Sequence, residues 1–230
     1  MVERTSFGIR AFDKLIGGGV IRPSAILLLG DIGAGKNVIC QQFIWDGLNK
    51  GEAGIYFCID HPPDAIRENM ASFEWDIKPF EEKGDLILVD SFISRKGESK
   101  EKHIIEDPFN LEQHVMAWTL LEKFENRPLR LVYDSLSSIT YMESFESICR
   151  FIRDLHGVIL NTNCVGLINS VRGMQDNKLE LTIQQTLGNV FKLKKDGAKI
   201  FLQIEKMEAT KHHQKPIQIV TVDRGVVMLQ

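Results

Sequence analysis

The sequence lacks the features of a membrane or secreted protein. No apolar run approaches the roughly 18 residues that a membrane-spanning helix needs, and the strongly apolar stretch AILLLG at 25–30 has the length of a strand. The first ten residues, MVERTSFGIR, carry charges where a secretion signal would have its apolar core. We therefore expect a cytoplasmic protein that does not enter the membrane.

Paired cysteines and a strong net charge are also missing. The four cysteines, Cys40, Cys58, Cys149 and Cys164, are far apart, so we expect reduced thiols rather than a zinc site or a disulfide framework. The net charge of −3 gives no overall attraction to nucleic acid or to anionic lipid. With 43% hydrophobic and 26% charged residues, the chain is predicted to be one packed domain over residues 1–230.

Short apolar runs alternate with longer stretches of helical periodicity. The first four apolar runs are nearly continuous, which is typical of strands buried on both faces of a parallel sheet. Strands are expected at 24–29, 54–59, 85–90, 129–134 and 165–170, and helices at 36–48, 63–74, 110–125 and 144–156. This alternation predicts an α/β fold with a mainly parallel central sheet flanked by helices.

The pattern changes from about residue 188. Apolar and polar residues alternate in NVFKLKKDG, KIFLQIEKM and PIQIVTVDRGVVML, with the turn signals DG and DRG. These segments predict antiparallel C-terminal β-hairpins at one edge of the sheet. The charged stretch 93–107, ISRKGESKEKHIIED, has no periodicity and is expected to be a mobile surface loop.

The segment GDIGAGKN at 30–37 fits the phosphate-binding pattern G-x-x-x-x-G-K, except that the pattern continues with Ser or Thr. Its glycines let backbone N–H groups converge on phosphate oxygens, and the following helix and the lysine add positive charge. A buried strand precedes the segment and an amphipathic helix follows it, as this chemistry requires. The expected nucleotide-binding residues are Gly30, Asp31, Ile32, Gly33, Ala34, Gly35, Lys36, Asn37 and Val38.

Asn37 stands where the pattern has the hydroxyl that ligates Mg²⁺. An amide oxygen can ligate a hard cation, but it sits on a longer arm, and Mg²⁺ demands near-octahedral geometry at about 2.0–2.1 Å. Asp134, at the end of LRLVYD, is the second candidate metal residue, although aspartate there is also a common helix cap. We expect Asn37 to weaken metal binding and turnover more than phosphate binding.

Together these segments resemble the KaiC/RadA branch of the RecA-like ATPases, and the likeness covers nearly the whole chain. TSFGIRAFDKLIGGGV resembles the segment ahead of the phosphate loop, YFCIDHPPDAIRENM the second strand and helix, LVYDSLSS the Walker B strand, and IEKMEATKHHQKPIQIVTVDRGVVML the C-terminal hairpins. As in archaeal KaiC-like proteins, the resemblance implies a RecA-like fold, ATP or ADP with Mg²⁺ as ligands, and a homo-oligomer such as a hexamer.

The catalytic positions of that family are altered here. After the second strand the family has paired glutamates, whereas this chain has Asp60 and His61, which are weak candidates for a general base. Family members reach a neighbour's γ-phosphate with a lysine and an arginine. Lys206 keeps the lysine, but Glu208 replaces the arginine, which in related enzymes contributes about 10³–10⁵-fold to the rate. With Asn37, these changes predict an ATP-binding regulatory or assembly module with weak or absent hydrolysis and an unidentified protein partner.

Two other functions stay open. A fully competent ATPase would use Asp60 as base and keep Mg²⁺ on Asn37. A recombinase paralogue would bind single-stranded DNA on loops such as 171–182, VRGMQDNKLELT. That loop mixes basic and acidic residues and has no aromatic residue to stack a base, so it gives nucleic acid little support as a partner.

Two basic segments have no assigned role. Lys192, Lys194 and Lys195 form a cluster that we interpret as a solvated face of a hairpin. The pair His212 and His213 either approaches a neighbouring subunit's nucleotide, as the resemblance implies, or lies in an exposed loop.

Overall fold

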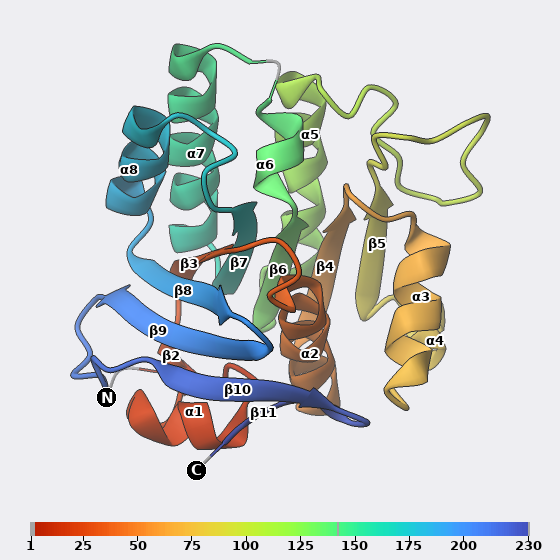
Figure 1. The fold of residues 1–230 in the computed structure, drawn as a ribbon. Coiled ribbons are helices and arrows are strands. Elements are labelled where there is room, and N and C mark those ends of the chain that lie inside the picture. Colours follow the sequence, from red (N-terminus) through yellow and green to blue (C-terminus); the bar gives the residue numbers. More distant parts are fainter. Residues whose placement is uncertain (1–2, 142, 230) are drawn as a thin grey trace.

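The fold was analysed in a computed structural model that describes residues 3–141 and 143–229. Within these residues a nine-stranded sheet has the order β11-β10-β9-β8-β3-β7-β6-β4-β5, and helices cover both of its faces (Figure 1). Its parallel part comprises β3 (Ser24–Gly30), β4 (Ala53–Cys58), β5 (Leu86–Asp90), β6 (Leu129–Asp134) and β7 (Cys164–Val171). These are the five strands expected from the apolar runs.

The C-terminal hairpins are confirmed at one edge of the sheet. Strand β8 pairs parallel to β3 and antiparallel to β9, and the antiparallel pairing continues outward to β10 and β11. Their bounds are β8 (Asn189–Asp196), β9 (Lys199–Met207), β10 (Ile217–Val222) and β11 (Gly225–Met228). A separate antiparallel pair joins β1 (Arg4–Thr5) to β2 (Val20–Ile21).

All four expected helices form, with a correction to one of them and a correction to one expected loop. The bounds are α1 (Arg10–Leu15), α2 (Lys36–Asn49), α3 (Pro63–Ser72), α4 (Lys78–Lys83), α5 (Leu111–Ala117), α6 (Leu136–Ile139), α7 (Phe145–Leu160) and α8 (Asn177–Thr186). The helix expected over 110–125 is α5 followed by a 3₁₀ helix, Trp118–Phe124. The loop expected over 171–182 is wrong in its second half, because the Asp176 side chain accepts a hydrogen bond from Leu179 N and caps α8.

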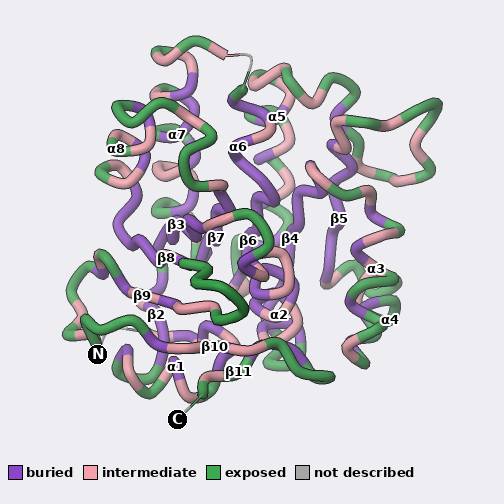
Figure 2. The backbone as a smooth tube through the Cα atoms, viewed as in Figure 1, coloured by how far each residue is buried: buried purple, intermediate pink, exposed green. Residues whose placement is uncertain are grey.

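Strand β3 is buried on both faces because successive side chains of a strand point to opposite sides. Ile26 and Leu28 pack with α2 and the N-terminal segment, whereas Leu27 and Leu29 pack with α7. The strands of the sheet centre are accordingly buried along their length (Figure 2). The loop that follows β3 is therefore anchored at its start by a strand that is buried along its whole length.

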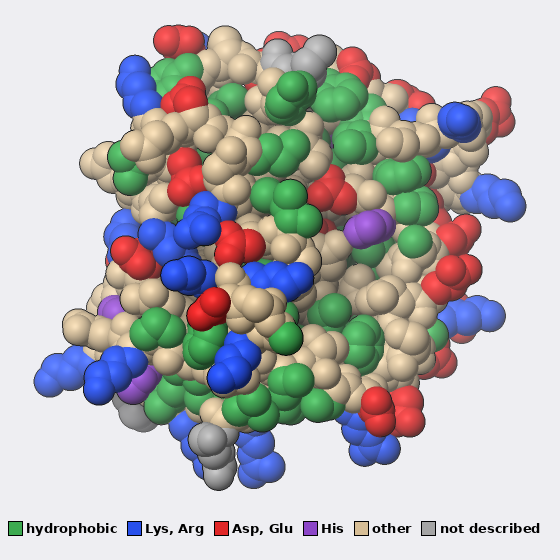
Figure 3. Space-filling view, in the orientation of Figure 1, with side chains coloured by type: hydrophobic (Ala, Val, Ile, Leu, Met, Phe, Trp, Pro, Cys, Tyr) green, Lys and Arg blue, Asp and Glu red, His purple; other side chains and the backbone are tan. Residues whose placement is uncertain are grey.

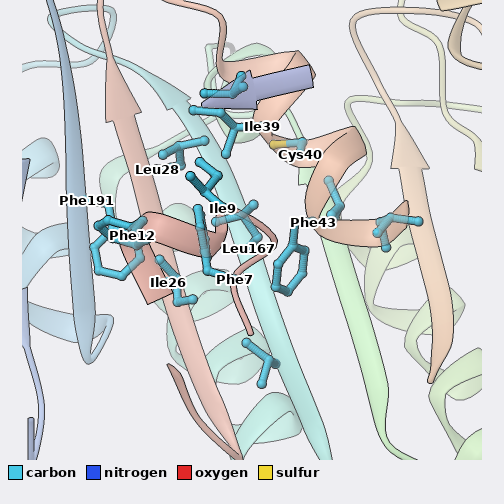
Figure 4. Close-up of a cluster of buried hydrophobic side chains, with 14 of the residues drawn as sticks. Phe7, Ile9, Phe12, Ile26, Leu28, Ile39, Cys40, Phe43, Leu167 and Phe191 are labelled. Atoms are coloured by element: carbon cyan, nitrogen blue, oxygen red, sulfur yellow. The ribbon is translucent and has the colours of Figure 1, made fainter. Parts of the chain in front are cut away.

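An aromatic cluster fastens the N-terminal segment to the α2 face. The ring centroid of Phe7 lies 5.3 Å from the centroid of Phe12 and 5.3 Å from that of Phe191. Phe43 of α2 also packs on Phe7, at 5.7 Å (Figure 4). Edge-to-face packing of this kind stabilises beyond the area it buries. The segment ahead of β3 is thus part of the core on the side that carries α2.

A buried ion-pair network joins the same parts of the chain. The fully buried Arg130 of β6 lies 2.9 Å from Glu52 and 3.0 Å from Asp46 of α2, and Arg22 lies 2.6 Å from Glu52. Burial alone would raise the pKa of Glu52, but hydrogen bonds and charge from Arg130, Thr5 and Arg22 lower it to about 2. Each buried charge therefore has a partner, as burial requires.

The segment 93–107 is attached to the sheet edge. Asp90 N donates to His103 O at 2.9 Å, Ile105 N donates to Asp90 O at 2.9 Å, and Ser99 Oγ donates to the Asp90 carboxylate at 2.5 Å. Glu101 forms a 2.7 Å ion pair with Arg67 of α3. The mobility expected of this segment stays a prediction, but it is held to β5 and α3 by specific bonds.

Two sequence expectations concern thiols and membranes. The four cysteines are free, with three buried and Cys149 half-buried. No helix in the described part of the chain is both long enough and apolar enough to span a bilayer.

A buried histidine links α5 to β6 and is held neutral. Trp118 Nε1 donates to the Tyr133 hydroxyl at 2.8 Å, and that hydroxyl lies 3.5 Å from His114 Nδ1. His114 Nε2 lies 2.8 Å from Pro108 O, which requires that this nitrogen carry the proton. Burial lowers the pKa of His114 to about 4. A second proton on Nδ1 would face the Tyr133 hydroxyl in the core.

We expect this histidine to make stability depend on pH. The folded pKa of His114 is lowered from 6.5 to about 4, so the unfolded chain binds more protons as pH falls below 6.5. Between pH 7 and pH 5, His114 should cost about 1.5 to 2 kcal/mol of unfolding free energy. Urea unfolding at both pH values should show that His114→Gln removes this loss, while His213→Gln, at an exposed position, does not. Equal pH dependence in all three proteins would contradict the prediction.

Candidate nucleotide-binding site

The loop between β3 and α2 has the backbone that a phosphate cradle needs. Gly33 and Gly35 have φ of 72° and 75°, the left-handed region that favours glycine. At Gly30 a Cβ atom would lie 2.7 Å from Leu193 Cβ and 3.0 Å from Leu193 O. Glycine at these places lets the loop curl against β8 and lead into the N-terminus of α2. Free N–H groups and the helix dipole then face the same space.

Lys36 is buried at the start of α2. Its ammonium donates to Gly30 O at 3.1 Å and to Asp31 O at 2.9 Å, so it lies folded on the loop. Burial lowers the pKa of Lys36, while the nearby charges of Asp134, Asp31 and Asp60 counteract that effect. A phosphate arriving at the loop would offer this ammonium stronger acceptors than the two carbonyls.

Three strand residues meet beside the loop on the face that carries α2. Asp134 ends β6, and its two carboxylate oxygens accept hydrogen bonds at 2.5 Å from Tyr56 of β4 and from Asn169 of β7. The same Asn169 amide donates to Asn37 Oδ1 at 3.3 Å. The structure therefore brings the two candidate metal residues together, but through a third residue.

The sequence analysis missed Tyr56 and Asn169. The signal for Asn169 is a polar residue inside the apolar run VGLINS, at a position that is only 1% exposed. Tyr56 gives no such signal in the sequence, because an aromatic ring is an ordinary residue of a buried apolar strand. Both belong to the site because parallel strands place their carboxyl ends at the same edge.

The carboxyl group of Asp134 is unusually buried for a charged group, since the residue is only 1% exposed. Burial raises its pKa, the hydrogen bonds from Tyr56 and Asn169 lower it, and the charge of Asp60 raises it further. Its backbone also belongs to the sheet, since Asp134 O accepts from Ile59 N at 3.0 Å and from Asp60 N at 3.1 Å. Asp134 thus lies at a fixed position between β4 and β7, rather than only capping the following helix.

These oxygens fit Mg²⁺ poorly. The Asn37 amide oxygen and both Asp134 oxygens already face hydrogen-bond donors. The Asn169 NH₂ group lies between the two oxygens that a cation would bridge, and its own positive hydrogens would oppose an ion there. Within residues 3–141 and 143–229, no group of three or more His, Cys, Asp or Glu side chains could hold a metal ion.

The two candidate bases differ in placement. Asp60 Oδ1 is buried and has no hydrogen-bond partner among the described residues, so it keeps an acceptor position that these residues do not fill. His61 is exposed, at the surface end of the same turn. Of the two, Asp60 is the one with a free buried acceptor next to the site.

Lys206 and Glu208 lie away from the loop of their own chain. Lys206 pairs with Val190 at the start of β8, whereas the loop end of β3 pairs Gly30 with Leu193. Its ammonium donates to Gln185 O at 3.2 Å and to Leu187 O at 3.1 Å, and it lies 4.0 Å from the Glu208 carboxylate. Lys206 therefore lies at the other end of β8 from the loop, and its role toward a neighbouring subunit stays a prediction.

The basic cluster lies next to the loop, and two of its lysines, Lys194 and Lys195, are exposed, as expected of a solvated face. Lys195 N donates to the Asp31 carboxylate at 2.9 Å, and Arg172 forms a 2.9 Å ion pair with the same group. Lys192 and Lys194 line an adjoining cavity of about 260 Å³, and the basic side chains gather on this face among acidic ones (Figure 3). Asp31 thereby fixes the first turn of the loop to β8.

The histidine pair lies beyond β9 in the connection to β10. His212 is half-buried, with Nδ1 3.0 Å from Thr210 O, and His213 is exposed. Neither touches the loop at 30–37 in this chain, so a role toward a neighbouring nucleotide stays a prediction.

The parallel sheet, its hairpin edge and the loop before α2 define a RecA-like domain. The family profile described as ATPase: KaiC matches residues 5–230, and the chain belongs to this family. It is 30% identical to a UPF0273 protein of Pyrococcus horikoshii over 99% of this chain and 94% of that protein. A UPF0273 protein of Thermotoga maritima is 28% identical over 99% and 96%.

A solved structure agrees with the fold. The crystal structure of a KaiC-like protein from Pyrococcus horikoshii matches all of both chains with a TM-score of 0.82 and 25% identity. The expected RecA-like fold is therefore confirmed. Membership in this ATPase family implies the use of a nucleotide with Mg²⁺. In this chain the Asn37 oxygen already accepts a hydrogen bond from Asn169.

The packing at Gly30 predicts opposite effects for two glycine substitutions. Gly30→Ala should destabilise the protein by about 1 to 3 kcal/mol, because the new methyl group overlaps Leu193. Gly157→Ala is the matched control, since among the described atoms nothing lies within 4 Å of that Cβ. This control lies within α7 and should stabilise by about 0.5 to 1 kcal/mol. Urea unfolding measures both, and a Gly30→Ala protein as stable as wild type would show that the loop does not need this close approach.

Proposed function

We propose that this protein binds ATP or ADP at the loop 30–37 and hydrolyses ATP slowly or not at all. It would act as a regulatory or assembly module whose copies associate through bound nucleotide. The observation that carries the proposal is a glycine loop with a buried lysine folded on it, beside candidate metal oxygens that each already accept a protein hydrogen bond.

Phosphate binding needs only the parts that are present. The loop offers backbone N–H groups, α2 offers the positive end of its dipole, and Lys36 offers an ammonium that is already at the loop. When this ammonium leaves Gly30 O and Asp31 O for a phosphate, it exchanges neutral acceptors for charged ones. Binding therefore does not depend on Asn37 or on the catalytic positions.

Hydrolysis needs parts that are altered. Asp60 has a shorter side chain than glutamate. A well-placed general base raises the rate by about 10²–10⁴-fold, and an imperfectly placed base gives only part of this increase. Glu208 would bring a negative charge to a neighbour's γ-phosphate, where the transition state needs a positive one. Both changes lower the rate and leave the phosphate cradle untouched.

The two alternatives receive less support. A competent ATPase would need Mg²⁺ on Asn37, whose oxygen already accepts from Asn169. A recombinase would need free basic groups on the loop after β7, but Arg172 is paired with Asp31. That loop, residues 172–176, also has no aromatic residue.

Lys36 provides the direct test of nucleotide binding. Lys36→Ala should weaken ATP and ADP binding at least about tenfold, because the variant loses the ammonium that lies folded on the loop. Isothermal titration calorimetry measures this, with Lys78→Ala, whose side chain is 79% exposed on α4, as the control that keeps full affinity. Equal affinity in both variants, or no uptake by the wild type, would reject the loop as the nucleotide site.

Steady-state turnover tests the weak-hydrolysis part. We expect a rate well below about one per second, the lower end of ordinary enzymes. A rate near that value that is lost in Lys36→Ala would show a competent ATPase.

Glu208 tests the contribution between subunits. Glu208→Arg should raise ATP turnover at least about tenfold, because it restores the charge that stabilises the transition state. The gain should appear only at concentrations where light scattering shows an oligomer in ATP. The charge-matched control is Glu98→Arg in the segment 93–107, which should leave the rate unchanged. A gain in monomeric protein would contradict a role toward a neighbour.

A further inference from the structure

The group that joins Asn37 to Asp134 is an amide and not an ion. The Asn169 Nδ2 atom lies 2.5 Å from Asp134 Oδ1 and 3.3 Å from Asn37 Oδ1. An amide NH₂ has two hydrogens, one for each of these oxygens. It therefore presents partial positive charge to both acceptors, where a cation would present a full charge, and it leaves the net charge unchanged.

The bridging amide is held in a fixed place. Asn169 is 1% exposed and lies in the sheet centre, where its Cα pairs with Leu28 of β3. The acceptor is equally fixed, because Tyr56 donates to the other oxygen of Asp134 at 2.5 Å. An ion that entered between Asn37 and Asp134 would have to displace this amide and leave a buried NH₂ without acceptors, which is costly.

From this geometry we infer that the Asn169 amide takes the place of the metal, so that this protein takes up metal-free ATP as readily as Mg²⁺–ATP. The inference rests on nucleotide binding at the loop 30–37, as proposed above, and specifies which form of the nucleotide the site accepts. The charge of the phosphates is then met by Lys36, the loop amides and the N-terminus of α2 alone.

The wild-type protein gives the first test. Isothermal titration with ATP is performed in excess Mg²⁺ and in excess EDTA, at matched ionic strength because the charge of the ligand differs. We expect two dissociation constants that agree within about threefold. The titration is repeated in excess Mn²⁺, a substitute for Mg²⁺, and should give a dissociation constant in the same range.

Two substitutions should create the metal dependence that the wild type lacks. In the double variant Asn37→Thr with Asn169→Ala, a hydroxyl of short reach faces an Asp134 oxygen that has lost its amide donor. ATP should then bind at least about tenfold more tightly in Mg²⁺ than in EDTA, because the two oxygens are free for an ion. The matched control is Asn163→Ala, an exposed asparagine just before β7, which should keep the wild-type ratio.

The outcomes separate this inference from the proposed function. Wild-type binding that requires Mg²⁺, or that improves more than about threefold with it, overturns the inference and leaves nucleotide binding intact. Binding in neither condition overturns the proposed function itself. If the double variant does not fold, as judged by circular dichroism, the wild-type titrations still decide.

Discussion

The position of one buried carboxylate, that of Asp134, organises this protein's candidate site. Its two oxygens are each held at 2.5 Å, by Tyr56 and by Asn169, and its carbonyl receives two backbone hydrogen bonds from the turn after β4. A carboxylate in this position needs such partners, because burial raises its pKa and disfavours its charge. The ends of β4, β6 and β7 are therefore coupled to the same group, and the loop before α2 adjoins it through Asn37.

In the function proposed above, the site combines a standard means of binding with an altered means of catalysis. Backbone conformation at Gly33 and Gly35 and the ammonium of Lys36 are matters of local chain geometry, and they are retained. Catalysis requires charges placed from other strands and from another subunit, and there the sequence has Asp60, His61 and Glu208. Affinity and turnover can diverge in this way because binding energy shared by substrate and transition state adds nothing to the chemical step.

Membership in the KaiC family informs about the fold, whereas the hydrogen bonds in the site inform about the role of single residues. The family fixes the RecA-like sheet, the hairpin edge and the expectation of a nucleotide. It does not fix the role of each position, since the oxygens that would serve Mg²⁺ here accept from Asn169 and Tyr56. Function has to be argued from such contacts, because one fold supports many chemistries.

The sequence by itself determined what depends on near neighbours along the chain. Continuous apolar runs located the five parallel strands, alternation located the hairpins, and the spacing of glycines and Lys36 located the loop, because each pattern reflects a local backbone period. The capping of α8 by Asp176 is also local, but the many polar residues around it favour a loop in the sequence analysis. Only the tertiary structure placed the Asn169 amide beside Asn37, 132 residues earlier in the chain. It alone also set Lys206 away from its own loop. Strand order and register decide such contacts, and these follow from the packing of the whole sheet rather than from any single segment.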